Sequence, residues 1–85
     1  MPGQDYEIKA PVTLEQIFNG GEIDVRAELP EQDAHGLLHR KPRTFRITIP
    51  KGASDGQRLR LNGKGGPGAN GGKAGDLYVV LALQP

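Results

Sequence analysis

The sequence contains no cysteine and no tryptophan, and aromatic residues form only 5% of the chain. The lack of cysteine excludes disulfide bonds, cysteine-ligated zinc and thiol nucleophiles, and it is typical of proteins in a reducing compartment. No apolar run approaches the roughly 18 residues of a membrane-spanning helix, and the chain opens without a charged-then-apolar leader. We therefore expect a cytoplasmic protein without a membrane partner.

Catalytic and metal-binding patterns are equally scarce. Ser54 is the only serine, and it lies in an expected turn rather than in a G-x-S-x-G nucleophile elbow. His35 and His39 are four residues apart, but Gly36 lies between them and only Asp33 is near enough to join a ligand set. We expect both to be loop histidines that bind no metal. The sequence thus favours a protein that is not an enzyme and carries no cofactor.

A glycine-rich stretch, residues 62–75, holds seven glycines in fourteen residues. Gly63, Gly65 and Gly68 match the G-x-G-x-x-G dinucleotide fingerprint, and an expected strand precedes them. That fingerprint needs a following helix whose N-terminus binds the pyrophosphate, whereas here Pro67, more glycines and another strand follow. We therefore interpret the stretch as a flexible connector, with glycines where side chains would obstruct turns.

The charges are unevenly distributed, although the net charge is only +1. Residues 1–39 contain eight acidic and two basic residues, whereas residues 40–64 contain eight basic residues and one acidic residue. Either the two halves fold together and pair their charges, or the basic half binds an acidic partner or nucleic acid. Charge pairing is the simpler expectation.

Apolar periodicity predicts five strands and one short helix. The helix begins at Thr13, which forms a capping box with Gln16, and it ends at Asn19-Gly20. Residues 30–42 show no clear period and are expected to form a loop. The expected strands cover residues 5–12, 22–29, 43–50, 57–63 and 76–83.

The last expected strand is apolar on both faces, which predicts a central position in its sheet or a face that a partner covers. With five strands, one helix and abundant turn glycines, the fold class is mainly β. We expect a small two-sheet sandwich or a partly open barrel with one short helix, in which residues 1–85 form a single β domain.

Four short motifs in the second half occur together in one protein family. With VTLEQIFNGGEIDV at residues 12–25, they resemble the carboxy-terminal substrate-binding region of the DnaJ (heat-shock-protein-40) co-chaperones. The resemblance is to the first β domain of that region, in the curved-DNA-binding-protein type, because no cysteine-rich zinc module interrupts residues 30–42. The motifs are Ile49-Pro50-Lys51-Gly52, Gly56-Gln57-Arg58-Leu59-Arg60-Leu61, Gly63-Lys64-Gly65 and Gly75-Asp76-Leu77.

The resemblance implies a client-binding module. Domains of this family hold extended apolar segments of unfolded proteins and deliver them to the Hsp70 chaperone. The segment adds as an extra strand in a shallow groove beside the second strand. Two of the groove positions are alanine where relatives often carry larger residues, which implies weak binding. The positions that match the groove are Ile8, Ala10, Ile23, Val25, Ala27 and Val79.

The resemblance also indicates parts that this chain lacks. No His-Pro-Asp tripeptide is present, so the chain by itself is not expected to stimulate Hsp70 hydrolysis. The family's second β domain and its dimerisation segment are missing as well. We therefore expect a fragment of a longer protein, and we expect that protein to be a homodimer.

DNA binding is the main alternative to client binding. Basic residues on the outward faces of strands contact phosphates without reading sequence, and the likeness to curved-DNA-binding relatives strengthens this hypothesis. Such a protein would be associated with the nucleoid within the cytoplasm. A third hypothesis is a passive scaffold that only positions neighbouring domains. The candidate DNA-binding residues are Arg43, Arg46, Arg58, Arg60 and Lys64.

Overall fold

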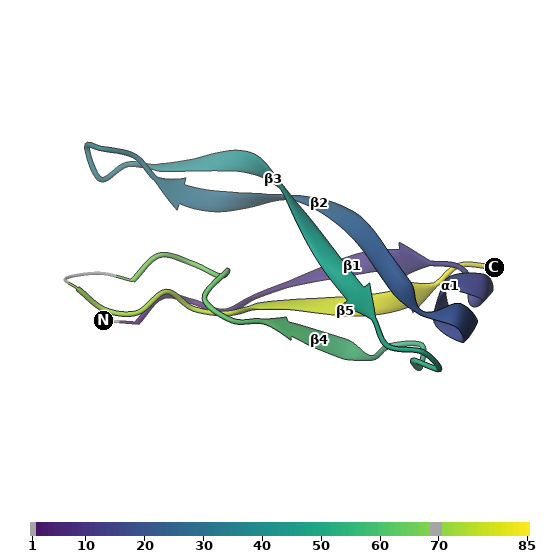
Figure 1. The fold of residues 1–85 in the computed structure, drawn as a ribbon. Coiled ribbons are helices and arrows are strands. Elements are labelled where there is room, and N and C mark those ends of the chain that lie inside the picture. The colour runs from purple at the N-terminus through teal and green to yellow at the C-terminus, as the bar shows by residue number, and fades with distance from the viewer. Residues whose placement is uncertain (1, 69–70) are drawn as a thin grey trace.

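The computed structural model describes residues 2–68 and 71–85, and their strands form two small sheets (Figure 1). One sheet has three strands in the order β1-β5-β4, and the other pairs β2 with β3 in antiparallel fashion. The mainly β, two-sheet fold with one short helix is confirmed, and the described strands do not close into a barrel. The elements are β1 (Tyr6–Val12), α1 (Leu14–Asn19), β2 (Gly21–Gln32), β3 (Leu38–Ile49), β4 (Arg58–Leu61) and β5 (Leu77–Leu83).

The helix α1 marks the point where the chain passes from one sheet to the other. The predicted capping box is present: the Thr13 hydroxyl accepts a bond from the Gln16 amide at 3.1 Å, and Gln16 Oε1 accepts one from the Thr13 amide at 2.8 Å. Gly20 ends the helix with a φ of 73°, a conformation that residues with a side chain rarely adopt. The side chain of Ile17 is buried against the core.

The core lies between the two sheets, and β5 is the centre of the larger one, as its two apolar faces predicted. β5 pairs in parallel with β1 and antiparallel with β4. The predicted alternation holds in the core, because alternate residues of β1, β2, β3 and β5 point inward and are buried there. The buried strand residues are Ala10, Val12, Leu77, Val79 and Leu81 from the larger sheet and Val25, Leu29, Phe45, Ile47 and Ile49 from the smaller one.

The prediction of a loop at residues 30–42 is wrong. β2 continues to Gln32 and β3 begins at Leu38, so only a short turn separates the two strands. The resulting hairpin extends well beyond the place where β2 and β3 cross the other sheet (Figure 1). Every residue of β3 from Leu38 to Thr44 is exposed, and this explains the missing period: none of these residues contributes to the core.

The hydrogen-bond ladder shows why prolines are tolerated in this hairpin. The Asp33 amide donates to the Leu37 carbonyl at 2.8 Å and closes the turn. Along an antiparallel pair, residues whose amide and carbonyl face the partner strand alternate with residues whose groups face outward. Counted from Asp33 in the observed register, Pro30 and Pro42 occupy outward-facing positions, so no ladder bond is lost.

The two histidines differ in environment. His35 lies in the turn, as expected, but His39 lies in β3, so the loop assignment is wrong for His39. His39 Nε2 is 2.6 Å from the Asp33 carboxylate, which also accepts the His35 and Leu37 amides. The imidazole and these amides lower the pKa of Asp33 below its ordinary value. The cluster holds the hairpin turn together.

The glycine connector between β4 and β5 forms backbone hydrogen bonds along its described part. Its Gly66 amide donates to the Gln4 carbonyl at 2.7 Å, and the Gly75 amide donates to the Gly66 carbonyl at 2.9 Å. A Cβ on Gly75 would collide with the Gln4 backbone, so glycine is required for this close approach. No helix follows β4 in the described part of the connector, which removes the dinucleotide interpretation. Ala69 and Asn70 lie outside the described residues.

The contribution of the α1 capping box to stability can be tested by mutation. We expect Thr13→Ala to lower the free energy of unfolding by about 1 kcal/mol, because the Gln16 amide loses its acceptor. Urea unfolding followed by circular dichroism measures this change. Thr13→Ser keeps the hydroxyl and is the matched control. Equal stability of Thr13→Ala and Thr13→Ser would show that the cap contributes nothing.

Candidate functional site

The two sheets leave four strand edges unpaired among the described residues. β2 and β3 pair only with each other, and β1 and β4 are the outer strands of the larger sheet. Because β5 separates β1 from β4, the sandwich is open on two opposite sides, one flanked by β1 and β2 and the other by β3 and β4. Unpaired edges present free amides and carbonyls and are therefore templates for an additional strand.

A cleft of about 320 Å³ lies on the first side, between β1, β2 and α1. We call it the β1/β2 cleft. Ile23 and Val25 provide its apolar floor, whereas charged and polar side chains surround its mouth. The lining residues are Lys9, Pro11, Gln16, Ile23, Asp24, Val25 and Arg26.

The backbone of β2 faces this cleft with unpaired polar groups. In the register counted from Asp33, Asp24 and Arg26 are outward-facing residues whose amides and carbonyls point away from β3. The free edge of β2 lies on the side of the cleft, because β3 occupies its other edge. An extended segment placed there would therefore meet hydrogen-bonding groups from the backbone and apolar side chains from the floor.

The six residues predicted for a peptide groove fall into three groups by their location. Ile23 and Val25 line the cleft, although Val25 is only 8% exposed. Ile8 and Ala27 are partly buried against the core and do not belong to the lining. Ala10 and Val79 are 0% exposed and form part of the core beneath. The cleft thus gathers two of the six.

The charges around the β1/β2 cleft leave it with a positive mouth. The carboxylate of Glu7 pairs with Arg58 at 3.3 Å, and that of Asp24 pairs with Arg46 at 3.2 Å, so both acids are partly neutralised. Lys9 and Arg26 form no ion pair with any described residue. Sequence reasoning missed these mouth residues because it followed only the inward-facing alternate positions. The outward-facing residues of the same edge strands would have indicated the mouth of the cleft.

A second cleft, of about 370 Å³, lies on the opposite side between β3, β4 and the start of the glycine connector. We call it the β3/β4 cleft. It gathers four of the five residues predicted to bind DNA, which come from two separate parts of the sequence. The lining residues are Arg43, Thr44, Phe45, Arg46, Arg60, Leu61, Asn62 and Lys64.

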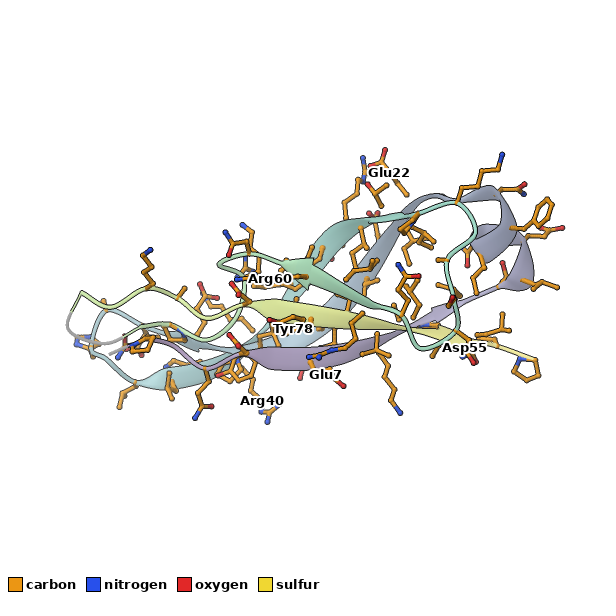
Figure 2. The ribbon with its side chains drawn as sticks, turned by 90° about the horizontal axis from the view of Figure 1, so that it is seen from below. Glu7, Glu22, Arg40, Asp55, Arg60 and Tyr78 are labelled. Carbon is orange, nitrogen blue, oxygen red and sulfur yellow. The ribbon has the colours of Figure 1, made fainter. Side chains whose placement is uncertain are left out.

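Arg58 is the fifth predicted DNA-binding residue, and it lies elsewhere. Its guanidinium lies over the ring of Tyr78, 4.3 Å from the centroid, and pairs with Glu7. Tyr78 on β5 is the register partner of Arg60 on β4 and of Glu7 on β1, and Figure 2 shows these three residues along one face of the larger sheet. Of the two β4 arginines on this face, only Arg60 also lines the β3/β4 cleft.

Asp76 links the β3/β4 cleft to the glycine connector. Its Oδ1 accepts the Gly63 amide at 2.9 Å, and its Oδ2 accepts Arg60 Nε at 2.8 Å. The Gly63 amide first, and then the Arg60 guanidinium, lower the pKa of Asp76 below its ordinary value, whereas Asp76 raises the pKa of Arg60. Asp76 is thus a fixed counter-charge for one of the four basic residues of the cleft.

Among residues 2–68 and 71–85, no three histidine, aspartate or glutamate side chains gather as metal ligands would. In the same part of the chain, no helix is long and apolar enough to cross a membrane. The expected pairing of charges between the two halves is partly present, since Arg46 and Arg58 pair with acids from residues 1–39.

Comparison with known proteins gives one consistent family. The family model of the DnaJ C-terminal domain matches residues 6–85. The chain is 40% identical over 86 residues to a curved DNA-binding protein of Serratia proteamaculans, and 43% identical over 84 residues to one of Salmonella arizonae. These alignments cover 100% and 98% of this chain but only 28% of each relative. The chain thus spans little more than a quarter of the relatives it matches.

The contacts of Asp76 predict a dependence of stability on pH. Because the native pKa lies below the ordinary value of 3.8, the stabilisation is complete above about pH 3.8 and is lost as the pH falls through the native pKa. We expect Asp76→Asn to lower the melting temperature at neutral pH, and this deficit should shrink in acid. Thermal unfolding from about pH 7 to about pH 2.5 measures it.

The matched control for Asp76 is Glu28→Gln, which removes a carboxylate that has no ion-pair partner among the described residues. A deficit for Asp76→Asn that stays constant over the whole pH range would contradict the predicted linkage. A deficit no larger than that of Glu28→Gln at neutral pH would show that the Asp76 contacts do not stabilise the fold.

Proposed function

Because the chain belongs to the DnaJ C-terminal domain family, we propose that it is a non-catalytic module that binds extended apolar segments of unfolded proteins. The segment adds as a strand to the free edge of β2 in the β1/β2 cleft. The observation that carries this proposal is the coincidence of two features on one strand. Outward-facing backbone groups at Asp24 and Arg26 lie beside the apolar side chains of Ile23 and Val25.

The six groove residues have different roles in this proposal. Ile23 and Val25 contact the bound segment, and Ala27 extends the apolar strip along β2. Ile8 adds a partly buried contact from β1. Ala10 and Val79 support the floor from within the core and do not touch the ligand. The small apolar floor supports weak, sequence-tolerant binding, as a protein that releases its clients requires.

The proposal extends to the longer protein of which this module is a part. There we propose cooperation with an Hsp70 chaperone, which receives the bound segment, and assembly into a homodimer that places two modules side by side. Two weak sites on one particle bind one unfolded chain more tightly than either site alone. We place this protein in the cytoplasm, in association with the nucleoid where it also binds DNA.

Strand addition is tested by removing one amide from the edge of β2. We expect Arg26→Pro to weaken binding of an extended Leu-rich peptide by about two- to tenfold relative to Arg26→Ala, because one backbone hydrogen bond is lost. Pro30 occupies a position of the same class in β2, so the ladder with β3 accommodates the change. Peptide affinity is measured by fluorescence anisotropy, and amide NMR shifts locate the site.

Arg26→Ala is the control because it removes the same side chain and keeps the amide. Equal peptide affinities of Arg26→Pro and Arg26→Ala would sink the strand-addition mechanism. NMR shifts confined to the hairpin turn and the glycine connector would sink the cleft assignment.

DNA binding through the β3/β4 cleft is a second candidate function. The observation that favours it is the convergence of Arg43, Arg46, Arg60 and Lys64 on one cleft, although they lie on different strands and a loop. The relatives' name, curved DNA-binding protein, supports it. Such contacts with phosphates would be independent of sequence and sensitive to salt.

The DNA contact is tested by removing two cations from the β3/β4 cleft. We expect Arg43→Ala with Lys64→Ala to weaken binding to a duplex, and to reduce the salt dependence of log K by roughly 0.9 for each lost phosphate contact. Lys9→Ala with Lys51→Ala removes two positive charges outside this cleft and is the control. Affinities are measured by fluorescence anisotropy from about 50 to about 200 mM NaCl. Equal losses in both double variants would contradict a DNA site in this cleft.

A further inference from the structure

The four cations of the β3/β4 cleft are held in different ways. Lys64 forms no ion pair with any described residue, and the Arg43 guanidinium lies 5.1 Å from the ring centroid of Phe45, which leaves its charge available. Arg46 and Arg60 are both paired with carboxylates. Whether Arg46 and Arg60 can bind a phosphate of the DNA backbone therefore depends on how firmly their carboxylate partners hold them.

The pair between Arg60 and Asp76 is firmly held. The Asp76 side chain is only 13% exposed, and it accepts the Gly63 amide in addition to two nitrogens of Arg60. If Arg60 turned toward a phosphate, a largely buried carboxylate would lose its charged partner, which is costly. Arg60 is thus committed to the fold, and its charge is already neutralised.

The contacts of Arg46 are exposed and easily exchanged. Its Nε is 3.2 Å from Asp24 Oδ1 and 3.8 Å from Glu22 Oε2, and all three side chains are more than half exposed. Exposed ion pairs of this kind contribute little and are screened by salt. Figure 2 shows Glu22 pointing away from the body of the protein. A phosphate could therefore take the place of either carboxylate.

We propose that Glu22 and Asp24 are built-in competitors of the DNA backbone for Arg46. This inference rests on the proposed DNA binding at the β3/β4 cleft. In the free protein the two carboxylates hold Arg46, and a phosphate must displace them to use its charge. The DNA affinity of the module is then set by these acids of β2 as well as by the basic residues of the cleft.

The proposal predicts that removing the two carboxylates strengthens DNA binding. We expect Glu22→Gln with Asp24→Asn to raise duplex affinity about threefold or more at about 50 mM NaCl. We also expect the slope of log K against log salt to steepen by up to roughly 0.9, as one further phosphate contact requires. The control, Glu28→Gln with Glu31→Gln, removes two carboxylates of β2 that form no ion pair with a described residue.

A mutant cycle separates competition for Arg46 from a general change of charge. Arg46→Ala should cost more affinity in the Glu22→Gln, Asp24→Asn background than in the wild type, because Arg46 is free only in the former. Thermal unfolding confirms that each variant is folded.

The outcomes distinguish the inference from the function on which it rests. If the wild type binds DNA but Arg46→Ala costs the same in both backgrounds, the competition is refuted and the DNA site stands. An equal gain in DNA affinity from Glu22→Gln with Asp24→Asn and from the control, Glu28→Gln with Glu31→Gln, would also refute the competition. If the wild type and the neutralised variants all fail to bind duplex DNA at about 50 mM NaCl, both the inference and DNA binding are wrong.

Discussion

Burial of apolar side chains between the two sheets is the interaction on which this structure depends. Backbone pairing joins β1, β5 and β4, and it joins β2 with β3, but among the described residues no strand pair links the two sheets. They are held together by side chains such as Val79 and Leu81 on one sheet and Phe45 and Ile47 on the other. Since this burial needs only the inner faces, the edges of both sheets stay unpaired. The two clefts follow directly from this arrangement.

The sequence predicted correctly the strands that have one face buried in the core. Alternation of apolar residues arises where one face of a strand is buried, so the strands that enclose the core were found from their period. The distal half of the β2–β3 hairpin was missed because its residues from Leu38 to Thr44 are all exposed and have no buried face to create a period. Pro30 and Pro42 added to the error, because a proline is compatible with a strand only at an outward-facing position, and the register was not known.

The same reasoning explains what was found of the candidate sites. Ile23 and Val25 were predicted from the family resemblance, and they line the cleft because they are inward-facing residues next to a free edge. Ala10 and Val79 share that inward-facing pattern but lie in the core, and periodicity does not separate a floor from the layer beneath it. The basic residues of the β3/β4 cleft were recognised as a cluster in the sequence. Arg58 was grouped with them because the strand pattern does not show that Tyr78 and Glu7 hold its guanidinium away from the cleft.

The free edges also explain the distribution of proline and charge. An unpaired edge invites unwanted pairing with other chains, and proteins guard against this with prolines and charged side chains. Pro11 lies on the edge strand β1, and arginines lie along β3 and β4, whereas β2 has no proline before Pro30. The segment of β2 beside the β1/β2 cleft therefore carries charged side chains but no proline, so its outward-facing amides stay available to an added strand. The charged residues Asp24 and Arg26 limit unwanted pairing at this edge without removing any backbone amide.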